Sequence, residues 1–277
     1  MRRTLHAACV TAVLACAAAA TAQGLSRPIF DRFNLRLEAS AVTLATTIRL
    51  DSSTLERGTT LSFEDDFGLD DRTWTPTLSF EWQVKPRQRL AARWQDVPRG
   101  STTQALREIE WGDETIPIDS EVKLDFVVEQ IFVDYTYFPW MREEWAGGFG
   151  LGLRWMDLKT ILEVDKLELE DQLDVAAPLP YVYFEYLRML GERWRLRGGV
   201  GWLSVTIGDI DGGQWIGRLG VEYLTGRSWG FGAALNASAI NVDWSGIENH
   251  DGDNELRARV DLDIHDLSVY IRFRFGD

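Results

Sequence analysis

The fold is decided by an alternating stretch near the end of the chain, Leu267-Ser268-Val269-Tyr270-Ile271-Arg272-Phe273-Arg274-Phe275. Large apolar residues occupy every second position, with mostly polar residues between them. Because successive side chains of a β-strand point to opposite faces, this period predicts a strand with one apolar and one polar face. Phe33–Ser40 and Leu78–Gln83 repeat the pattern.

The same two-residue period predicts about ten strands and little helix. We expect the strands near residues 33–50, 72–84, 89–97, 121–138, 145–160, 176–190, 193–207, 213–225, 228–243 and 255–275. The third strand is expected to be interrupted at Pro98-Arg99-Gly100. In the fourth, the apolar positions change phase between Val128 and Ile131, which predicts a β-bulge.

The connections between these strands alternate between tight and long. The tight ones are 85–88, 139–144, 191–192 and 226–228, and the long polar ones are 51–71, 98–120, 161–175 and 244–254, with a shorter one at 208–212. Short turns on one side and long loops on the other are typical of transmembrane barrels. We therefore expect one all-β domain, an antiparallel transmembrane up-and-down β-barrel of about ten strands (about 8–12), with both termini on the periplasmic side.

The first 22 residues are expected to be a signal peptide for export through the Sec pathway. Arg2 and Arg3 precede an apolar, alanine-rich run, and Ala20-Thr21-Ala22 is a small-x-small cleavage pattern. The barrel domain would then be 23–277. In the alternative interpretation, a lipoprotein signal, Cys16 would be the lipidated first residue. Both cysteines lie in this segment, so the mature chain would have no thiol.

The composition excludes some partners. The chain has 29 basic and 43 acidic residues and a net charge of −14, and loss of Arg2 and Arg3 with the signal changes this to −16. Such a negative chain is a poor partner for nucleic acid. After the signal, no stretch approaches the ~18 apolar residues that a membrane helix needs. If the chain crosses a membrane, it must therefore do so with strands.

Aromatic residues recur at a spacing that fits a membrane rather than a soluble barrel. Pairs on one strand face lie 8 to 10 residues apart: Trp74 and Trp82, Trp145 and Trp155, Trp194 and Trp202, and Trp215 and Tyr223. At ~3.4 Å per residue and a tilt of ~40°, this separation projects to roughly 20–26 Å, close to the ~25 Å apolar band of outer-membrane barrels. We expect these eight residues to form two aromatic girdles.

The opposite strand face carries glycines and charged residues, which suggests a crowded lumen. The predicted lumen charge ladder consists of Glu38, Glu81, Arg93, Asp134, Arg154, Glu185, Arg197, Arg218, Glu222 and Arg272. Unpaired charges would be costly in a narrow interior, so we expect ion pairs. The ladder would either plug the lumen or form a charged constriction that selects small solutes. The glycines would leave room for long arginines.

At this point the chain resembles the small outer-membrane β-barrel proteins of Gram-negative bacteria. The resemblance covers nearly all of the mature chain and rests on the alternation, the aromatic spacing and the turn pattern. Phe273-Arg274-Phe275 is similar to the aromatic end of such proteins, although Gly276 and Asp277 follow it. The resemblance implies contact with outer-membrane lipid and lipopolysaccharide, and delivery by periplasmic chaperones and the barrel-assembly machinery.

The outer loops are acidic and could hold divalent cations. The clusters are 64–66 with 70–71, 163–174, and the acids between Asp243 and Glu255. Asp251-Gly252-Asp253-Asn254-Glu255 lacks the EF-hand spacing, and acidic runs are usually only solvated. We expect no specific metal site and no cofactor.

An enzymatic function is the least favoured hypothesis. The omptin outer-membrane proteases also have ten strands and use aspartates and a histidine at the outer rim. After the signal, the only histidines are His250, beside Asp251, and His265, and no stretch resembles the omptin motifs. We therefore expect no catalytic residue and no enzyme, but a structural or surface-interacting barrel with a plugged lumen. The alternatives are a narrow channel or ligand-binding barrel for small solutes, and an omptin-like surface protease.

Overall fold

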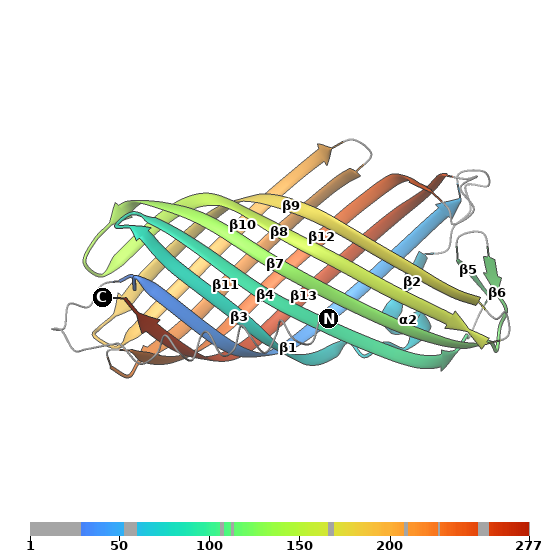
Figure 1. Cartoon of the computed structure of the whole chain (residues 1–277), viewed down its shortest axis with the longest axis horizontal. Helices are drawn as coiled ribbons and strands as arrows, with labels where there is room; N and C mark the ends of the chain where they lie inside the picture. The colour runs from blue at the N-terminus through green and yellow to red at the C-terminus, as the bar shows by residue number, and fades with distance from the viewer. Residues whose placement is uncertain are drawn as a thin grey trace.

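The computed structural model describes residues 29–52, 60–105, 108–111, 114–165, 169–207, 210–226, 228–248 and 255–276. Ten long strands run along the molecule (Figure 1): β1 Phe33–Ser52, β3 Arg72–Lys85, β4 Gln88–Gln104, β7 Glu121–Met141, β8 Trp145–Val164, β9 Leu169–Leu190, β10 Trp194–Ile207, β11 Ile210–Leu224, β12 Trp229–Glu248 and β13 Glu255–Phe275. Each coincides with a strand that the sequence predicts.

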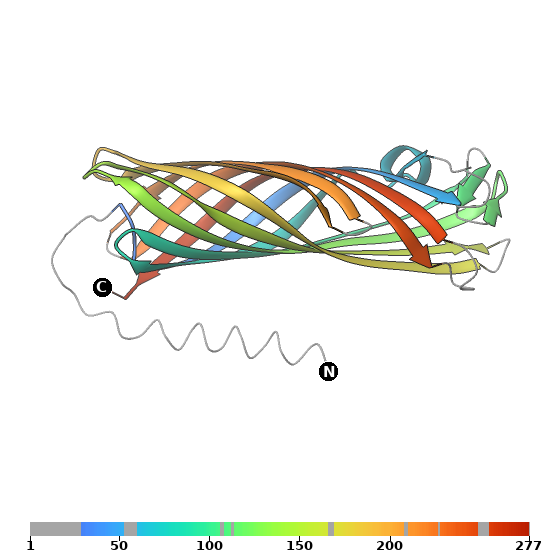
Figure 2. The same cartoon turned by 90° about the horizontal axis from the view of Figure 1, so that it is seen from above.

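These strands form a closed barrel. Each long strand pairs antiparallel with the next one along the chain, and β13 pairs back with β1 from Phe33↔Phe275 to Ser52↔Leu256. The predicted antiparallel up-and-down β-barrel is therefore confirmed. The tight turns gather at one end, where β1 begins and β13 ends (Figure 2). We call this the turn end, and the opposite end the loop end.

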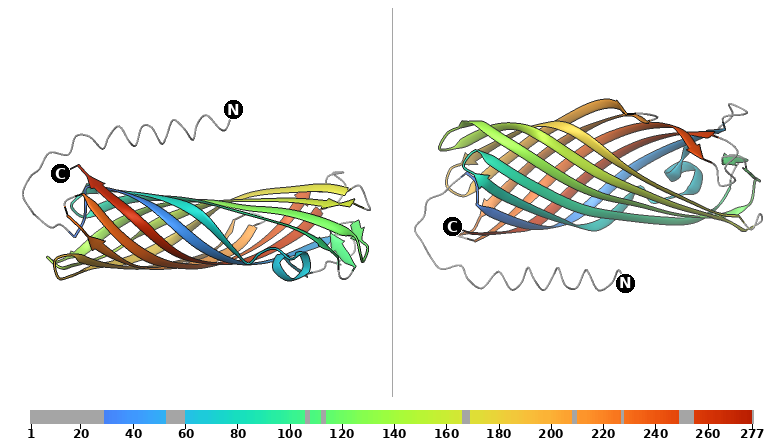
Figure 3. Two further views of the ribbon diagram at one scale, coloured as in Figure 1. Left: turned by 90° about the horizontal axis from the view of Figure 1, so that it is seen from below. Right: turned by 45° about the horizontal axis from the view of Figure 1, so that its top comes forward.

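Four short elements lie at the loop end. They are β2 Thr60–Ser62, α2 Phe63–Phe67, β5 Ile109–Trp111 and β6 Glu114–Ile116. β2 adds to β1, while β5 and β6 pair with each other. The α2 turn lies at the loop end (Figure 3). Among the described residues, no helix is long and apolar enough to cross a membrane.

Several strands reach further toward the loop end than the sequence predicts. β4 continues through Pro98 and Gly100 to Gln104, so the predicted interruption there is wrong. Most of the predicted long loop 161–175 is strand, because β8 ends at Val164 and β9 begins at Leu169. At the end of β4 the outward residues Thr102 and Gln104 are polar, which made this segment resemble a loop.

The predicted bulge between Val128 and Ile131 is also wrong. β7 keeps one register with β8 from Val122↔Val164 to Tyr137↔Phe149, and the irregularity lies between Tyr137 and Trp140. The apolar residues change side instead: Val128 points inward and Ile131 outward, on an uninterrupted strand. The strand has no extra residue. Its inward residues change from apolar to polar, and its outward residues change from polar to apolar.

The inversion occurs on strands around the barrel, and β13 shows it clearly. Near the loop end, Leu262 and Ile264 are buried and Asp263 is exposed. Beyond His265 the pattern reverses: Asp266 is buried and Leu267 exposed. The turn-side half therefore has a polar interior and an apolar exterior, and the loop-side half has the opposite arrangement.

The loop-side half consists of two sheets, because two seams of the barrel unzip there. Pairing of β3 with β4 stops at Thr77↔Gln95, and pairing of β9 with β10 stops at Val182↔Trp202. One sheet contains the outer ends of β4, β7, β8 and β9. The other contains those of β10 to β13 with β1 and the end of β3.

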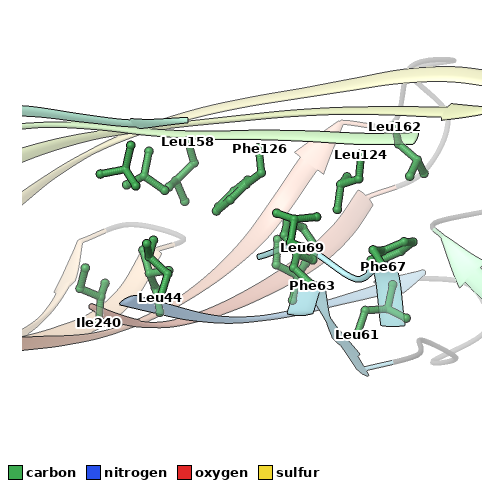
Figure 4. Close-up of a cluster of buried hydrophobic side chains, with 14 of the residues drawn as sticks. Leu44, Leu61, Phe63, Phe67, Leu69, Leu124, Phe126, Leu158, Leu162 and Ile240 are labelled. Carbon is green, nitrogen blue, oxygen red and sulfur yellow. The ribbon is translucent and has the colours of Figure 1, made fainter. Parts of the chain in front are cut away.

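An apolar core fills the space between the two sheets. Figure 4 shows Leu124, Phe126, Leu158 and Leu162 on one layer facing Leu44 and Ile240 on the other. Phe63 and Phe67 of α2 pack into the same core, and Phe63 contacts the Phe126 ring edge-on at 5.0 Å between ring centroids. The interior of this half is thus built like that of a soluble β-sandwich.

Prolines explain why the β3–β4 seam opens. Gln83 donates its backbone N–H to Arg32 across the β3–β1 side, so the even-numbered residues of β3 face β4. Phe138 donates to the carbonyl of Arg87, so the even-numbered residues of β4 face β3. Pro76 and Pro98 therefore lie where donors would be required, and proline has none.

The core should be as sensitive to truncation as that of a soluble protein. We expect Phe126→Ala to lower the free energy of unfolding by about 3–5 kcal/mol, because it leaves a cavity among packed side chains. The outward, half-buried neighbour provides the control, Val127→Ala, and should cost much less. Urea titration of the refolded protein measures both, and equal losses would contradict the two-sheet core.

Candidate functional site

The interior of the turn-side half is the most polar part of the molecule. The predicted ladder residues all have their side chains inside the barrel: Glu38, Glu81, Arg93, Asp134, Arg154, Glu185, Arg197, Arg218, Glu222 and Arg272. They come from β1, β3, β4, β7, β8, β9, β10, β11 and β13. Because each strand contributes alternate residues, the charges meet across the lumen rather than along one strand.

Glu81 lies at the centre of one ion-pair network. Its carboxylate pairs with Arg36 and Arg197, and Arg197 Nη2 donates to Glu81 Oε2 at 2.9 Å. Arg89 pairs with Glu185 and approaches Glu81 at 4.0 Å. Arg197 also lies 3.5 Å from Glu185, so two acids and three arginines form one connected group.

A second network closes the turn end. Asp31, just before β1, pairs with Arg272 and Arg195, and Arg274 lies 3.3 Å from it. Glu222 accepts from Arg195 Nε at 2.7 Å and lies 3.3 Å from Arg272 Nε. The sequence did not identify Asp31, because it precedes the alternating stretch.

Side chains outside the predicted ladder, such as Tyr181 and Asp266, complete the middle of the lumen. Asp134 pairs with Arg218 at 2.8 Å and accepts a hydrogen bond from the Tyr181 hydroxyl. Arg93 pairs with Asp266. Both Asp266 and Arg89 share the inward phase of their strands, so the period could have revealed them.

Arg154 differs from the other lumen arginines. It is fully buried, and no carboxylate among the described residues pairs with it. Its guanidinium donates to Gln130 and lies over the Phe132 ring. Gln130 donates to Gln95 at 2.6 Å, and Gln95 donates to Asp266 at 3.1 Å. A relay of two amides therefore connects Arg154 to a carboxylate.

Little space remains between these groups. A cavity of about 70 Å³ lies among Arg36, Glu81, Arg93, Asp134 and Arg218. It holds at most a few water molecules, since one needs roughly 10–15 Å³ of this volume.

The inward glycines leave room for aromatic rings more than for arginines. A Cβ on Gly152 would lie 2.2 Å from the Tyr181 ring, and one on Gly199 would lie 2.2 Å from the Tyr183 hydroxyl. The two tyrosines thus occupy the space that the glycines leave.

The outer face of the turn-side half is a continuous apolar surface. The residues predicted to form girdles lie on it: Trp74, Trp82, Trp145, Trp155, Trp194, Trp202, Trp215 and Tyr223. Trp74 is 70% exposed and Trp202 61%. Between them lie exposed Leu, Val, Ile and Phe residues such as Leu37, Leu151 and Val200. So large an apolar surface is not stable in water and requires a membrane or partner.

Among the described residues of the acidic loops, two acids hold α2 in place. Glu64 accepts from the Thr46 backbone at 2.9 Å and pairs with the buried Arg99, and Asp66 accepts from the Ser62 backbone at 2.9 Å. These acids therefore anchor α2. In the part of the chain that the structure describes, no group of three or more His, Cys, Asp or Glu side chains could hold a metal ion. Residues 249–254, with His250, lie outside the described residues. His265 faces outward.

Comparison with known proteins supports the fold assignment. No protein-family model and no curated protein sequence matches the chain. Among solved structures, the outer membrane protease OmpT from Escherichia coli superposes with a TM-score of 0.59 at 9% identity, covering 91% of this chain and 99% of that one. The translocator domain of autotransporter NalP from Neisseria meningitidis (TM-score 0.43, 11% identity, 99% and 96% covered) and OprG from Pseudomonas aeruginosa (0.43, 11%, 91% and 100%) are more distant.

The likeness to OmpT corrects one expectation. We expected no enzyme, but a solved structure that shares this fold over nearly its whole length is a protease. The lack of omptin motifs in the sequence therefore does not exclude an enzyme. At 9% identity the likeness shows the fold alone and assigns no activity. With its closed barrel and apolar exterior, the chain has the fold and the kind of outer surface that outer-membrane β-barrel proteins have.

The network around Glu81 generates a stability prediction. We expect Glu81→Gln to cost roughly 3–5 kcal/mol, because it leaves buried arginines without their counter-charge. In contrast, Lys123→Ala removes the exposed pair between Lys123 and Glu163 (2.8 Å), which should cost about 0–1 kcal/mol. Unfolding titrations in lipid vesicles measure the difference, and a neutral Glu81→Gln would show that the network adds no stability.

Proposed function

We propose that this protein is an outer-membrane barrel with a closed lumen that acts at the cell surface through its loop-side half. The observation that carries the proposal is that two different closures lie in series along one lumen. The first is the ion-paired interior of the turn-side half, and the second is the apolar core between the two sheets.

Each closure blocks ions for its own reason. In the turn-side half, the carboxylates and guanidiniums neutralise one another around Glu81 and Asp31, which leaves only a small cavity. In the loop-side half, buried residues such as Leu44, Phe63 and Phe126 offer no polar partner to a hydrated ion. A narrow channel would require a continuous wet path, and the apolar core interrupts it.

The second closure is anchored by α2. Ser62 caps this short helix by accepting from the Asp65 backbone at 3.2 Å, and Ser101 donates to the Phe67 carbonyl at 2.7 Å. The ion pair between Glu64 and Arg99 holds the helix to β4. With α2 in place, the loop-side half is a packed body whose polar outer surface is available for contacts.

Export and membrane placement follow from the same proposal. We propose that residues 1–22 are the signal peptide and that 23–277 form the barrel domain. Periplasmic chaperones and the barrel-assembly machinery would deliver it, with both termini periplasmic. The ladder residues would hold the barrel rigid, and the aromatic residues from Trp74 to Tyr223 would anchor it at the two membrane edges, in contact with lipopolysaccharide.

Conductance in planar bilayers tests the proposal. We expect no steady current steps from the refolded protein. Glu185→Ala should also be silent, since the apolar core still blocks the path when the first closure is weakened. A heat-modifiability gel shows that each preparation is folded. Steady, ion-selective steps that Glu185→Ala or Arg154→Ala alters would overturn the closed lumen in favour of the narrow channel.

A further inference from the structure

The seam between β9 and β10 ends abruptly in the middle of the barrel. The last paired residues are Val182 and Trp202. Beyond them β9 continues to Leu169 in register with β8, and β10 continues to Ile207 in register with β11. Both strands therefore persist and only their mutual pairing is lost. Figure 1 shows β10 and β11 running away from β9 toward the loop end.

Two prolines account for the position of this break. Met189 donates its backbone N–H to Glu144 on the β8 side, so the even-numbered residues of β9 face β10. In the register set by Val182↔Trp202, the next two such residues are Pro180 and Pro178. Neither can donate a hydrogen bond, so the ladder cannot extend past Val182.

The side chain of Gln214 spans the open seam from inside. Gln214 of β11 reaches past β10, and its Nε2 donates to the Leu179 carbonyl at 2.7 Å and lies 3.3 Å from the Pro180 carbonyl. Gln214 is buried, and its Oε1 has no hydrogen-bond partner among the described residues. A buried amide oxygen without a donor is costly, which suggests that the seam has another state or takes a ligand.

The interior behind the seam is apolar. Ala177 and Leu179 of β9 belong to the core between the two sheets, while Ile216 and Leu203 pack with Tyr181 beside them. At the other open seam, α2 fills the interior, and side chains connect the edges: Thr75 donates to the Asp96 carbonyl and Arg99 to that of Asp70 (3.4 Å). Beyond Val182, Arg218 Nη2 of β11 also lies 3.4 Å from the Tyr181 hydroxyl of β9. Within the described ranges, Gln214 is the side chain of the β10–β11 hairpin that bonds to backbone carbonyls of β9 there.

The seam opens where the apolar exterior ends. Trp202, at the last pair, and Trp155, in register with Pro178, are large exposed aromatics. Directly beyond them the outward residues become polar, as at Asp157 and Ser204. A molecule in the outer leaflet, with its polar end at the membrane surface, would meet the seam from the side.

We propose that the β9–β10 seam is a lateral opening through which a single acyl chain of a lipid or fatty acid enters the apolar interior of the loop-side half. The chain would lie against Leu179, Leu203 and Ile216, and Gln214 closes the seam when it is empty. Addition of a partner strand is disfavoured, because Pro178 and Pro180 lack the donors that it would need. This inference rests on one part of the proposed function, namely that the apolar core of the loop-side half contains no water-filled path.

Photolabelling with diazirine-bearing palmitate tests the opening. The refolded protein is placed in phosphatidylethanolamine–phosphatidylglycerol vesicles, and labelled residues are identified by mass spectrometry. We expect label on Leu179, Leu203 and Ile216. The variant Pro178→Val/Pro180→Val restores both donors and should reduce this inner label about tenfold, in proportion to the open fraction.

The matched control is Pro76→Val/Pro98→Val, at the seam that α2 covers, which should leave the inner label unchanged. Amide hydrogen exchange at Ser204 and Thr206 reports whether β9 and β10 have paired beyond Val182 in Pro178→Val/Pro180→Val. If exchange there stays fast, Gln214→Leu decides instead, because removal of the connecting amide should raise the inner label severalfold.

The outcomes separate this inference from the proposed function. Label restricted to outward residues such as Val182 and Trp202 would mean ordinary lipid contact and would overturn the opening. The opening would also be overturned if neither Pro178→Val/Pro180→Val nor Gln214→Leu changed the amount of label on the inner residues. Current steps in bilayers would refute the closed lumen whatever the labelling shows, whereas silent bilayers without inner label would refute only the lateral opening.

Discussion

The structure depends on the strict alternation of side chains across continuous strands. A strand such as β13 passes from the half with an apolar exterior to the half with an apolar interior in unbroken register with β1. Because neighbouring residues point to opposite faces, exchanging apolar and polar positions inverts both faces at once. The charged turn-side interior and the apolar loop-side core are therefore two results of one constraint, and they meet at residues such as Glu129 and His265.

A change of environment also changes what the backbone requires. In the turn-side half all ten seams are closed, as a barrel surrounded by lipid requires. Two of the seams end at prolines near the outer edge of the apolar exterior, where Pro76 and Pro98 interrupt one ladder and Pro178 and Pro180 interrupt the other. The wall can then separate into two sheets around a core, with α2 in one seam and the Gln214 amide in the other.

Much of this could be predicted from period alone. The ten strands, the closed barrel and the inward phase of residues such as Glu81 and Arg197 follow from local alternation. The phase change in β7 was mistaken for a bulge, because the period does not tell which side is inside. The open seams and the pairing of Asp31 with Arg272 depend on neighbours far apart in the sequence. The four prolines could be read from the sequence. Whether a proline interrupts a ladder depends on which neighbouring strand its backbone nitrogen faces, and that is known only from the structure.

The pairing of β1 with β13 has a consequence for how the protein is made. It joins the first strand to the last, so the ring has no closed form until β13 has been made. Contacts this distant in sequence form slowly, and until they form both edge strands are open to wrong partners. The hairpins between neighbouring strands can form earlier, but the closed ring is completed only when the two ends of the sheet meet.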